Sequence, residues 1–242
     1  MTMNLAGGAL NPLSKPELTG DESAEEFVSV KKHQEFLQKM SDLPLGFSVG
    51  VSELTFDPAE VPSMVDLPMR LTLILLDKPT SAWTALYTTN AFPGAPVLVG
   101  KRRLASGTPL QAVIINNKIA NVCAGGPPGA GEKASEAICR GVGNLLSMMV
   151  DEDEDRNGPG DDKSGKDSET AADIFAQMVL PCSTGVIGWS LPVPAMLRAV
   201  PTVVESARSG NLNALDAARS IMTTDRYPKV RKCRNLPPYE SK

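Results

Sequence analysis

Ser183, Thr184 and Gly185 directly follow a short apolar segment and carry the clearest chemical potential in this sequence. A strand that stops at Ser-Thr-Gly exposes hydroxyl groups beside backbone amides, and glycine lets the chain adopt a positive φ or approach a ligand closely. Such a hydroxyl and N–H pair can stabilise the negative charge that develops on a carbonyl oxygen during acyl transfer. From local spacing alone, a plain turn capped by serine or threonine is favoured.

Asn116, Asn117 and Asn121 form a second polar segment, at the end of a predicted strand. Their carboxamides can bind a polar ligand. They can equally satisfy the backbone groups of a loop, since asparagine tolerates the left-handed conformation and makes Asx turns. The residues by themselves favour the loop role, and Asn121 is kept as a candidate ligand contact.

Thr223, Thr224 and Asp225 end a predicted helix and form a third polar segment. Their hydroxyls and carboxylate could contact the ammonium group and polar end of an amino acid, although alone they indicate only a polar helix terminus. A glycine-rich stretch at residues 125 to 131 has no following Lys-Ser/Thr and matches no phosphate-binding loop, so a nucleotide site is excluded there.

The composition narrows the class of protein. Of the 242 residues, 42% are apolar and only 5% aromatic, which suits a mixed α/β core better than an aromatic-rich β-sandwich. Four scattered cysteines and a single histidine, His33, argue against a zinc site and against a Ser-His-Asp triad within the chain. Clustered basic and aromatic residues that would indicate nucleic-acid binding are lacking, and so is an apolar run long enough to span a membrane.

The N-terminus and the cysteines bear on localisation. The first 20 residues have neither the pattern of a secretory signal nor the arginine-rich pattern of a transit peptide. The cysteines have the spacing of reduced thiols rather than of a disulfide framework. We therefore expect a cytoplasmic protein or a protein of an organellar matrix, mitochondrial or plastid, that is not secreted.

The elements needed to position these segments alternate between strands and helices. Strands are predicted at residues 47–56, 70–76, 83–89, 111–116 and from 179 onward. Helices are predicted at residues 21–40, 132–149, 171–178, 194–200, 203–207 and 212–222. An α/β or α+β layered fold follows from this alternation.

Three regions are expected along the chain: an N-terminal arm and helix at 1–43, a main domain at 44–235 and a tail at 236–242. Within the main domain, residues 151–170 hold nine acidic and three basic side chains, which gives this segment a charge of −6. Since the whole chain has a net charge of −4, the remaining residues together carry +2. Because so charged a segment has little to bury, a disordered insertion is predicted there.

Four motifs lie in order along the chain, at residues 88–90 with 95–97, at 115–116 with 121–123, at 183–188 and at 222–225. Taken together, they resemble the N-terminal half of the bifunctional ornithine acetyltransferase/glutamate N-acetyltransferase family. The resemblance implies the α-chain portion of a layered α-β-β-α sandwich and no metal or organic cofactor. It also implies a precursor that cuts itself before a threonine, which becomes the nucleophile at the N-terminus of a separate β chain, in a hetero-oligomer.

The resemblance also implies roles for single residues. Thr184 and Gly185 match the family's oxyanion hole, and Thr224 is the better match for its substrate-contacting threonine, with Thr223 as the neighbouring candidate. Asn121 is a further candidate for the substrate site. The implied reaction moves an acetyl group from N-acetylornithine to the partner's threonine and then to glutamate, in arginine biosynthesis.

The sequence departs from the family pattern in two places. Lys118 and Ile119 replace the family's usual Gly-Asn, and the family's Lys-Gly segment and Ala-Thr cleavage junction are not found. Two hypotheses follow: an α chain that needs a separate β chain to acetylate, or a catalytically inactive relative kept as a structural subunit of a larger complex. Another acyl-transfer or amidohydrolase activity is a third, less favoured reading.

Overall fold

A computed structural model describes residues 29–155 and 165–232. The chain divides between Phe36 and Leu37, and everything described below belongs to the larger part, Leu37–Lys242. Helix α1 (Val30–Lys39) crosses this division. It occupies the second half of the helix predicted at residues 21–40, of which residues 21–28 lie outside the described part of the chain.

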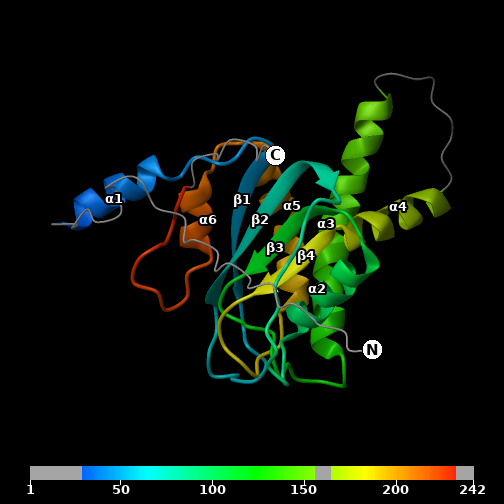
Figure 1. The fold of residues 1–242 in the computed structure, drawn as a ribbon. Helices are drawn as coiled ribbons and strands as arrows, with labels where there is room; N and C mark the ends of the chain where they lie inside the picture. Colours follow the sequence, from blue (N-terminus) through cyan, green and yellow to red (C-terminus); the bar gives the residue numbers. More distant parts are fainter. Residues whose placement is uncertain (1–28, 156–164, 233–242) are drawn as a thin grey trace, which may run out of the picture. The chain divides into compact units, whose positions relative to one another are not determined.

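A four-stranded sheet with the order β1-β2-β3-β4 forms the centre of the larger part (Figure 1). Its strands are β1 (Phe47–Phe56), β2 (Leu67–Thr80), β3 (Leu110–Asn116) and β4 (Val179–Ser183). The first three strands pair antiparallel, whereas β3 and β4 pair parallel with Asn116 opposite Ser183. Because parallel strands end at the same edge, the polar segments that follow β3 and β4 leave the sheet side by side.

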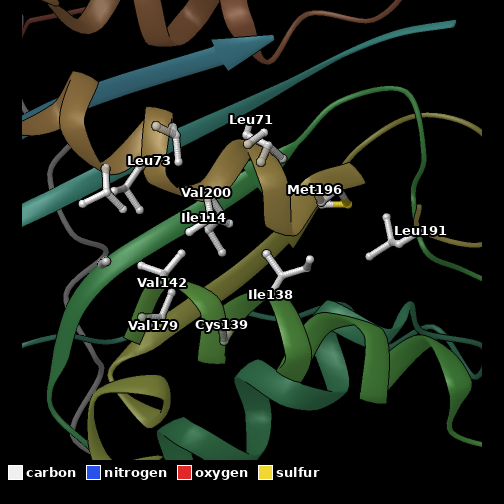
Figure 2. Packing of buried hydrophobic residues seen from close by; sticks show 14 of the residues in the cluster. Leu71, Leu73, Ile114, Ile138, Cys139, Val142, Val179, Leu191, Met196 and Val200 are labelled. Atoms are coloured by element: carbon white, nitrogen blue, oxygen red, sulfur yellow. The ribbon is translucent and has the colours of Figure 1, made fainter. Parts of the chain in front are cut away.

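One face of the sheet is covered by α3 (Ala130–Asp155) and α5 (Val193–Arg208). Figure 2 shows Leu71 and Ile114 of the sheet in one apolar cluster with Val200 of α5 and Val142 of α3. All four side chains are at most 3% exposed. Burial of such side chains removes apolar area from water and is the main source of the fold's stability.

The other face of the sheet carries the short helix α6 (Ala214–Ser220). Thr72 alternates with Leu71 and Leu73 along β2 and therefore points away from the main core. Its hydroxyl donates to the Ser220 hydroxyl at 2.7 Å, which fixes the end of α6 to the sheet. The layered α/β fold is confirmed, but the described residues contain a single sheet and therefore not the second β layer of an α-β-β-α sandwich.

The strand predicted at residues 83–89 is wrong, since this segment has no regular secondary structure and pairs with no strand of the sheet. Trp83, Ala85 and Tyr87 are half-buried and their neighbours exposed, so the alternation in the sequence is real. The Trp83 indole donates to the Thr108 carbonyl at 2.8 Å and anchors the segment outside the sheet. Alternating burial alone cannot distinguish such an anchored segment from a paired strand.

Several predicted helices differ from the observed ones. Helix α2 (Ala95–Ser106) was not predicted; Pro96 lies in its first turn, where proline is tolerated. The helices predicted at 194–200 and 203–207 form the single helix α5, which accommodates Pro201. Helix α6 is shorter than the predicted 212–222.

The disordered insertion predicted at 151–170 is wrong at both of its ends. Helix α3 continues to Asp155, and α4 (Gly165–Gln177) begins at Gly165. No glycine or proline interrupts residues 144–155, so the helical pattern has no stop signal there. Residues 156–164, most of the N-terminal arm and the tail at 236–242 lie outside the described residues. No helix in the described ranges combines the length and apolarity needed to cross a membrane.

Two thiols of the larger part differ sharply in environment. Cys139 on α3 is fully buried beside Arg103, and burial raises the pKa of its thiol to about 12, whereas Cys123 is exposed. At pH 8 a thiol of that pKa is thiolate in only about one molecule in 10⁴, and the thiolate is the reactive form. Iodoacetamide at pH 8 should therefore modify Cys123 and spare Cys139, as measured by peptide mass spectrometry, until urea unfolds the protein. Equal rates in the native protein would contradict the buried placement.

Candidate functional site

The loops that follow β3 and β4 run side by side beyond the sheet and form the candidate site. An isolated parallel bridge joins Ile119 to Val186, so the pairing of the two strands continues into the loops. Three further backbone amides fix the loop that holds residues 184–188. The hydrogen bonds run from Thr184 N to Asn116 O at 3.0 Å, from Val186 N to Lys118 O at 2.8 Å and from Gly188 N to Val122 O at 2.8 Å.

Gly185 lies at the closest approach between these two loops. Its φ is +138°, and a Cβ atom built on it would lie 2.1 Å from the carbonyl carbon of Lys118. No side chain fits in that space, and few residues other than glycine adopt this backbone conformation. The positive φ and close approach expected from the sequence are confirmed, but the closely approached group is the protein's own backbone.

Two hydrogen-bond donors of the Ser-Thr-Gly segment are not used within the described part of the chain. The Ser183 hydroxyl donates to Asn116 Oδ1 at 2.6 Å, and the Thr184 backbone amide donates to the Asn116 carbonyl oxygen. Neither the Thr184 hydroxyl nor the Gly185 amide has a partner among the described residues, and Gly185 is exposed. The segment therefore presents one hydroxyl and one backbone N–H from a fixed loop.

Asn116 and Asn117, each 2% exposed, join the three polar segments. Beyond its bond to Ser183, Asn116 donates through Nδ2 to the carbonyl oxygens of Asn117 and Ile119, at 3.1 and 2.8 Å. Asn117 Nδ2 donates to the carbonyl oxygens of Ser220 and Met222, at 3.1 and 3.2 Å. The loop role favoured by the sequence applies to both residues, and Asn117 brings the segment at 221–225 to the end of β3.

Asn121, in the loop after β3, is 1% exposed and contacts the first two turns of α3. Its Nδ2 donates to the Gly131 carbonyl at 3.0 Å and to the Ser135 hydroxyl at 2.9 Å, while its buried Oδ1 has no partner among the described residues. These bonds attach the loop after β3 to α3. A substrate contact by Asn121 stays a prediction.

A groove of about 600 Å³ opens beside the joined segments. Thr223 lines this groove, whereas Thr224 is exposed and is not among its lining residues. Asp225 is held by a hydrogen bond from Lys229 Nζ at 2.5 Å, which lowers the pKa of its carboxyl group. Of the polar side chains predicted here, Thr223 is the one that faces the groove.

Three basic residues of the groove were not predicted from the sequence. Arg70, Lys118 and Arg219 line it together with Glu53. They come from β2, the loop after β3 and α6, and no local pattern connects residues so far apart in the chain. Lys118 has a φ of +72°. The only sign of this backbone conformation in the sequence is that Lys118 lies in an asparagine-rich loop. Across the described ranges, no group of three or more His, Cys, Asp or Glu side chains is placed to hold a metal ion.

The ArgJ family model matches residues 65–155 and 158–237, which is well over half of the sequence. The chain belongs to the ArgJ family. The motifs at 88–97, 115–123, 183–188 and 222–225 all lie inside the matched ranges. The resemblance inferred from them is therefore confirmed.

Curated ArgJ relatives are considerably longer than this chain. The arginine biosynthesis bifunctional protein ArgJ of Nitratidesulfovibrio vulgaris is 33% identical over 191 residues, covering 79% of this chain and 39% of that protein. The mitochondrial protein of the same name from Paracoccidioides lutzii is 30% identical over 234 residues, covering 93% and 42%. The chain thus spans about two fifths of the length of these relatives.

A crystal structure of an ArgJ relative supports the fold. The ornithine acetyltransferase of Mycobacterium tuberculosis, solved in complex with ornithine, matches with a TM-score of 0.54 and 29% identity. The match covers 76% of this chain and 79% of that one. The layered arrangement of sheet and helices is therefore shared with a solved ornithine acetyltransferase.

Proposed function

We propose that this chain is the α chain of an acetyltransferase of arginine biosynthesis, which moves an acetyl group from N-acetylornithine to glutamate. Membership of the ArgJ family and the likeness to an ornithine acetyltransferase support this activity. The chain provides no nucleophile in this proposal. A separate β chain supplies an N-terminal threonine, and the two chains form a hetero-oligomer in the cytoplasm or in an organellar matrix.

The reaction proceeds in two acyl transfers. The partner's threonine oxygen attacks the acetyl carbonyl, its proton passes to the threonine's own α-amine, and the carbonyl oxygen becomes negatively charged. Collapse of this intermediate breaks the C–N bond, and ornithine leaves with the proton. The amine of glutamate then attacks the acetyl ester and loses a proton to the α-amine, which returns it to the threonine oxygen as the ester C–O bond breaks, and N-acetylglutamate is released.

Thr184 and Gly185 stabilise the oxyanion of both steps through the hydroxyl and the backbone amide. The observation that carries this assignment is that both donors lack a partner in the described part of the chain while the loop around them is fixed. Donors held in place before the reaction need no reorganisation as charge develops, and this is the usual source of a large electrostatic effect. The hydrogen bond that the Ser183 hydroxyl donates to Asn116 Oδ1 takes Ser183 out of this role.

Thr223 is the proposed contact to the polar end of the amino-acid substrate, because its side chain lines the groove. Thr224 was the better match by motif, but its position outside the groove makes it the second candidate. Asn121 is the third candidate, through its Oδ1 atom alone, since its amide nitrogen is occupied.

The test is acetyl exchange between N-acetylornithine and glutamate by the native complex, with Thr184→Ala, Thr184→Ser and the control Thr202→Ala. We expect Thr184→Ala to lower kcat by about 10²-fold, because one oxyanion donor is lost. Thr184→Ser should retain most activity, since it keeps the hydroxyl. Thr202 is exposed on α5, and its replacement should leave kcat unchanged.

Two outcomes would contradict the proposal. A native complex without a chain that begins with threonine would remove the nucleophile. A complex with no exchange, or one in which Thr184→Ala retains full activity, would favour the structural subunit considered from the sequence.

A further inference from the structure

The groove beside Thr223 carries an excess of positive charge. Arg70 Nε pairs with Glu53 Oε1 at 2.9 Å. Glu53 is the one acidic residue that lines the groove, and this ion pair balances its charge. Arg219 approaches Asp216 only at 4.0 Å, and Lys118 has no ion pair among the described residues. Two cationic groups in the groove are therefore weakly compensated or uncompensated, which favours an anionic ligand.

Lys118 occupies a backbone conformation that is unfavourable for lysine. Its φ is +72°, in the left-handed region where a Cβ atom is disfavoured and where glycine or asparagine would be accommodated more easily. The loop holds it there through hydrogen bonds from Val186 N to Lys118 O and from Ile119 N to Asn117 O. A residue kept in such a conformation at the wall of a groove suggests a function for its side chain.

The rest of the lining fits a carboxylate on a short aliphatic chain. Met222 and Pro228 provide apolar contact, and the Thr223 hydroxyl provides a neutral hydrogen-bonding group. The backbone of Lys118 packs against Gly185, so the groove lies next to the Thr184–Gly185 loop.

We propose that this groove binds a carboxylate group of the amino-acid substrate and that Lys118 is the ammonium donor that recognises it. The identity of the carboxylate as that of an amino acid rests on the proposed function. Binding of a carboxylate by Lys118 does not depend on it.

Binding to the full chain is tested by titration calorimetry with glutarate and with glutaramide, which has the same carbon skeleton without charge. Wild-type protein should bind glutarate with an affinity that falls as salt is added, and should not bind glutaramide. Lys118→Met should weaken glutarate binding about 5- to 10-fold, because a charge-assisted hydrogen bond is lost. Lys118→Arg should stay within about 2-fold of wild type, since it keeps the charge.

Two further variants separate binding from folding. Lys78→Met removes one exposed positive charge at the end of β2, outside the groove, and should leave glutarate affinity unchanged. Lys118→Gly should lose glutarate affinity although its thermal midpoint is no lower than that of wild type, because glycine accepts the positive φ. Equal glutarate affinity of Lys118→Met and wild type, or equal binding of glutaramide, would overturn the proposal.

Kinetics with the partner chain distinguish which carboxylate is bound. Recognition of the α-carboxylate should raise the KM of both N-acetylornithine and glutamate in Lys118→Met, whereas recognition of the glutamate side chain should raise the KM of glutamate alone. Unchanged KM values with active enzyme would refute the role of Lys118 and leave the proposed function intact. Absence of acetyl transfer by wild type, with glutarate binding that depends on Lys118, would refute the proposed function alone.

Discussion

Gly185→Ala should abolish most acetyl transfer, with kcat lowered by about 10³-fold or more, since it disturbs two oxyanion donors at once. The added Cβ would lie 2.1 Å from the Lys118 carbonyl carbon and 2.2 Å from its oxygen, so one of the two loops must move. Both contacts are with backbone, which cannot give way as a side-chain tip can. Movement of this loop displaces the Gly185 amide and the Thr184 hydroxyl from the positions they hold in the native protein.

Gly188→Ala is the matched control in the same loop. Its φ is +91°, also unfavourable for alanine, but a Cβ atom there meets nothing within 4 Å. Gly188→Ala should lower the free energy of unfolding by only about 1–2 kcal/mol, the cost of this backbone conformation for alanine, and should keep kcat within about tenfold of wild type. Steady-state exchange assays and urea unfolding of both variants separate activity from stability. If both variants lose the same activity, backbone strain in the loop and not the contact with Lys118 sets the effect.

The Ser-Thr-Gly segment could be predicted from the sequence because its signals are local. An apolar strand followed by hydroxyl residues and glycine predicts a strand end with a flexible backbone, and β4 indeed ends at Ser183 and the chain bends at Gly185, where φ is positive. Which of the two hydroxyls stays free could not be predicted, because Ser183 is taken by Asn116, a residue of the neighbouring strand. That partner depends on the parallel register of β3 and β4, which periodicity does not reveal.

The residues of the groove could not be predicted from local sequence patterns. The motif favours Thr224 over its neighbour Thr223, but the turn after α6 decides which of them lines the groove. The position of that turn depends on Asn117, whose carboxamide donates to carbonyl oxygens more than 100 residues later in the chain. Arg70 joins the groove for the same kind of reason, because the Arg70 amide donates to Asn117 Oδ1 at 2.8 Å.

Gly50→Ala adds one methyl group to the core and should lower the free energy of unfolding by about 3 kcal/mol. The added Cβ would lie 2.0 Å from the Val203 carbonyl oxygen and 2.5 Å from the Ala207 nitrogen, both in the backbone of α5. Helix α5 must therefore move away from β1, which opens the packing that includes Val200 and Met196. The alternating apolar pattern of residues 47–56 gave no sign of this contact, because the essential feature is the absence of a side chain.

Gly141→Ala in α3 tests whether contact with backbone is the cause. Its Cβ would lie 2.7 Å from Leu197 Cδ2, the tip of a side chain that is 38% exposed and free to rotate away. Alanine also favours the helix by about 1 kcal/mol over glycine, so the free energy of unfolding should stay within about 1 kcal/mol of wild type. Urea denaturation followed by circular dichroism measures both variants. Equal losses would mean that α5 adjusts to Gly50→Ala as readily as Leu197 adjusts to Gly141→Ala, and that β1 and α5 are not held at backbone contact.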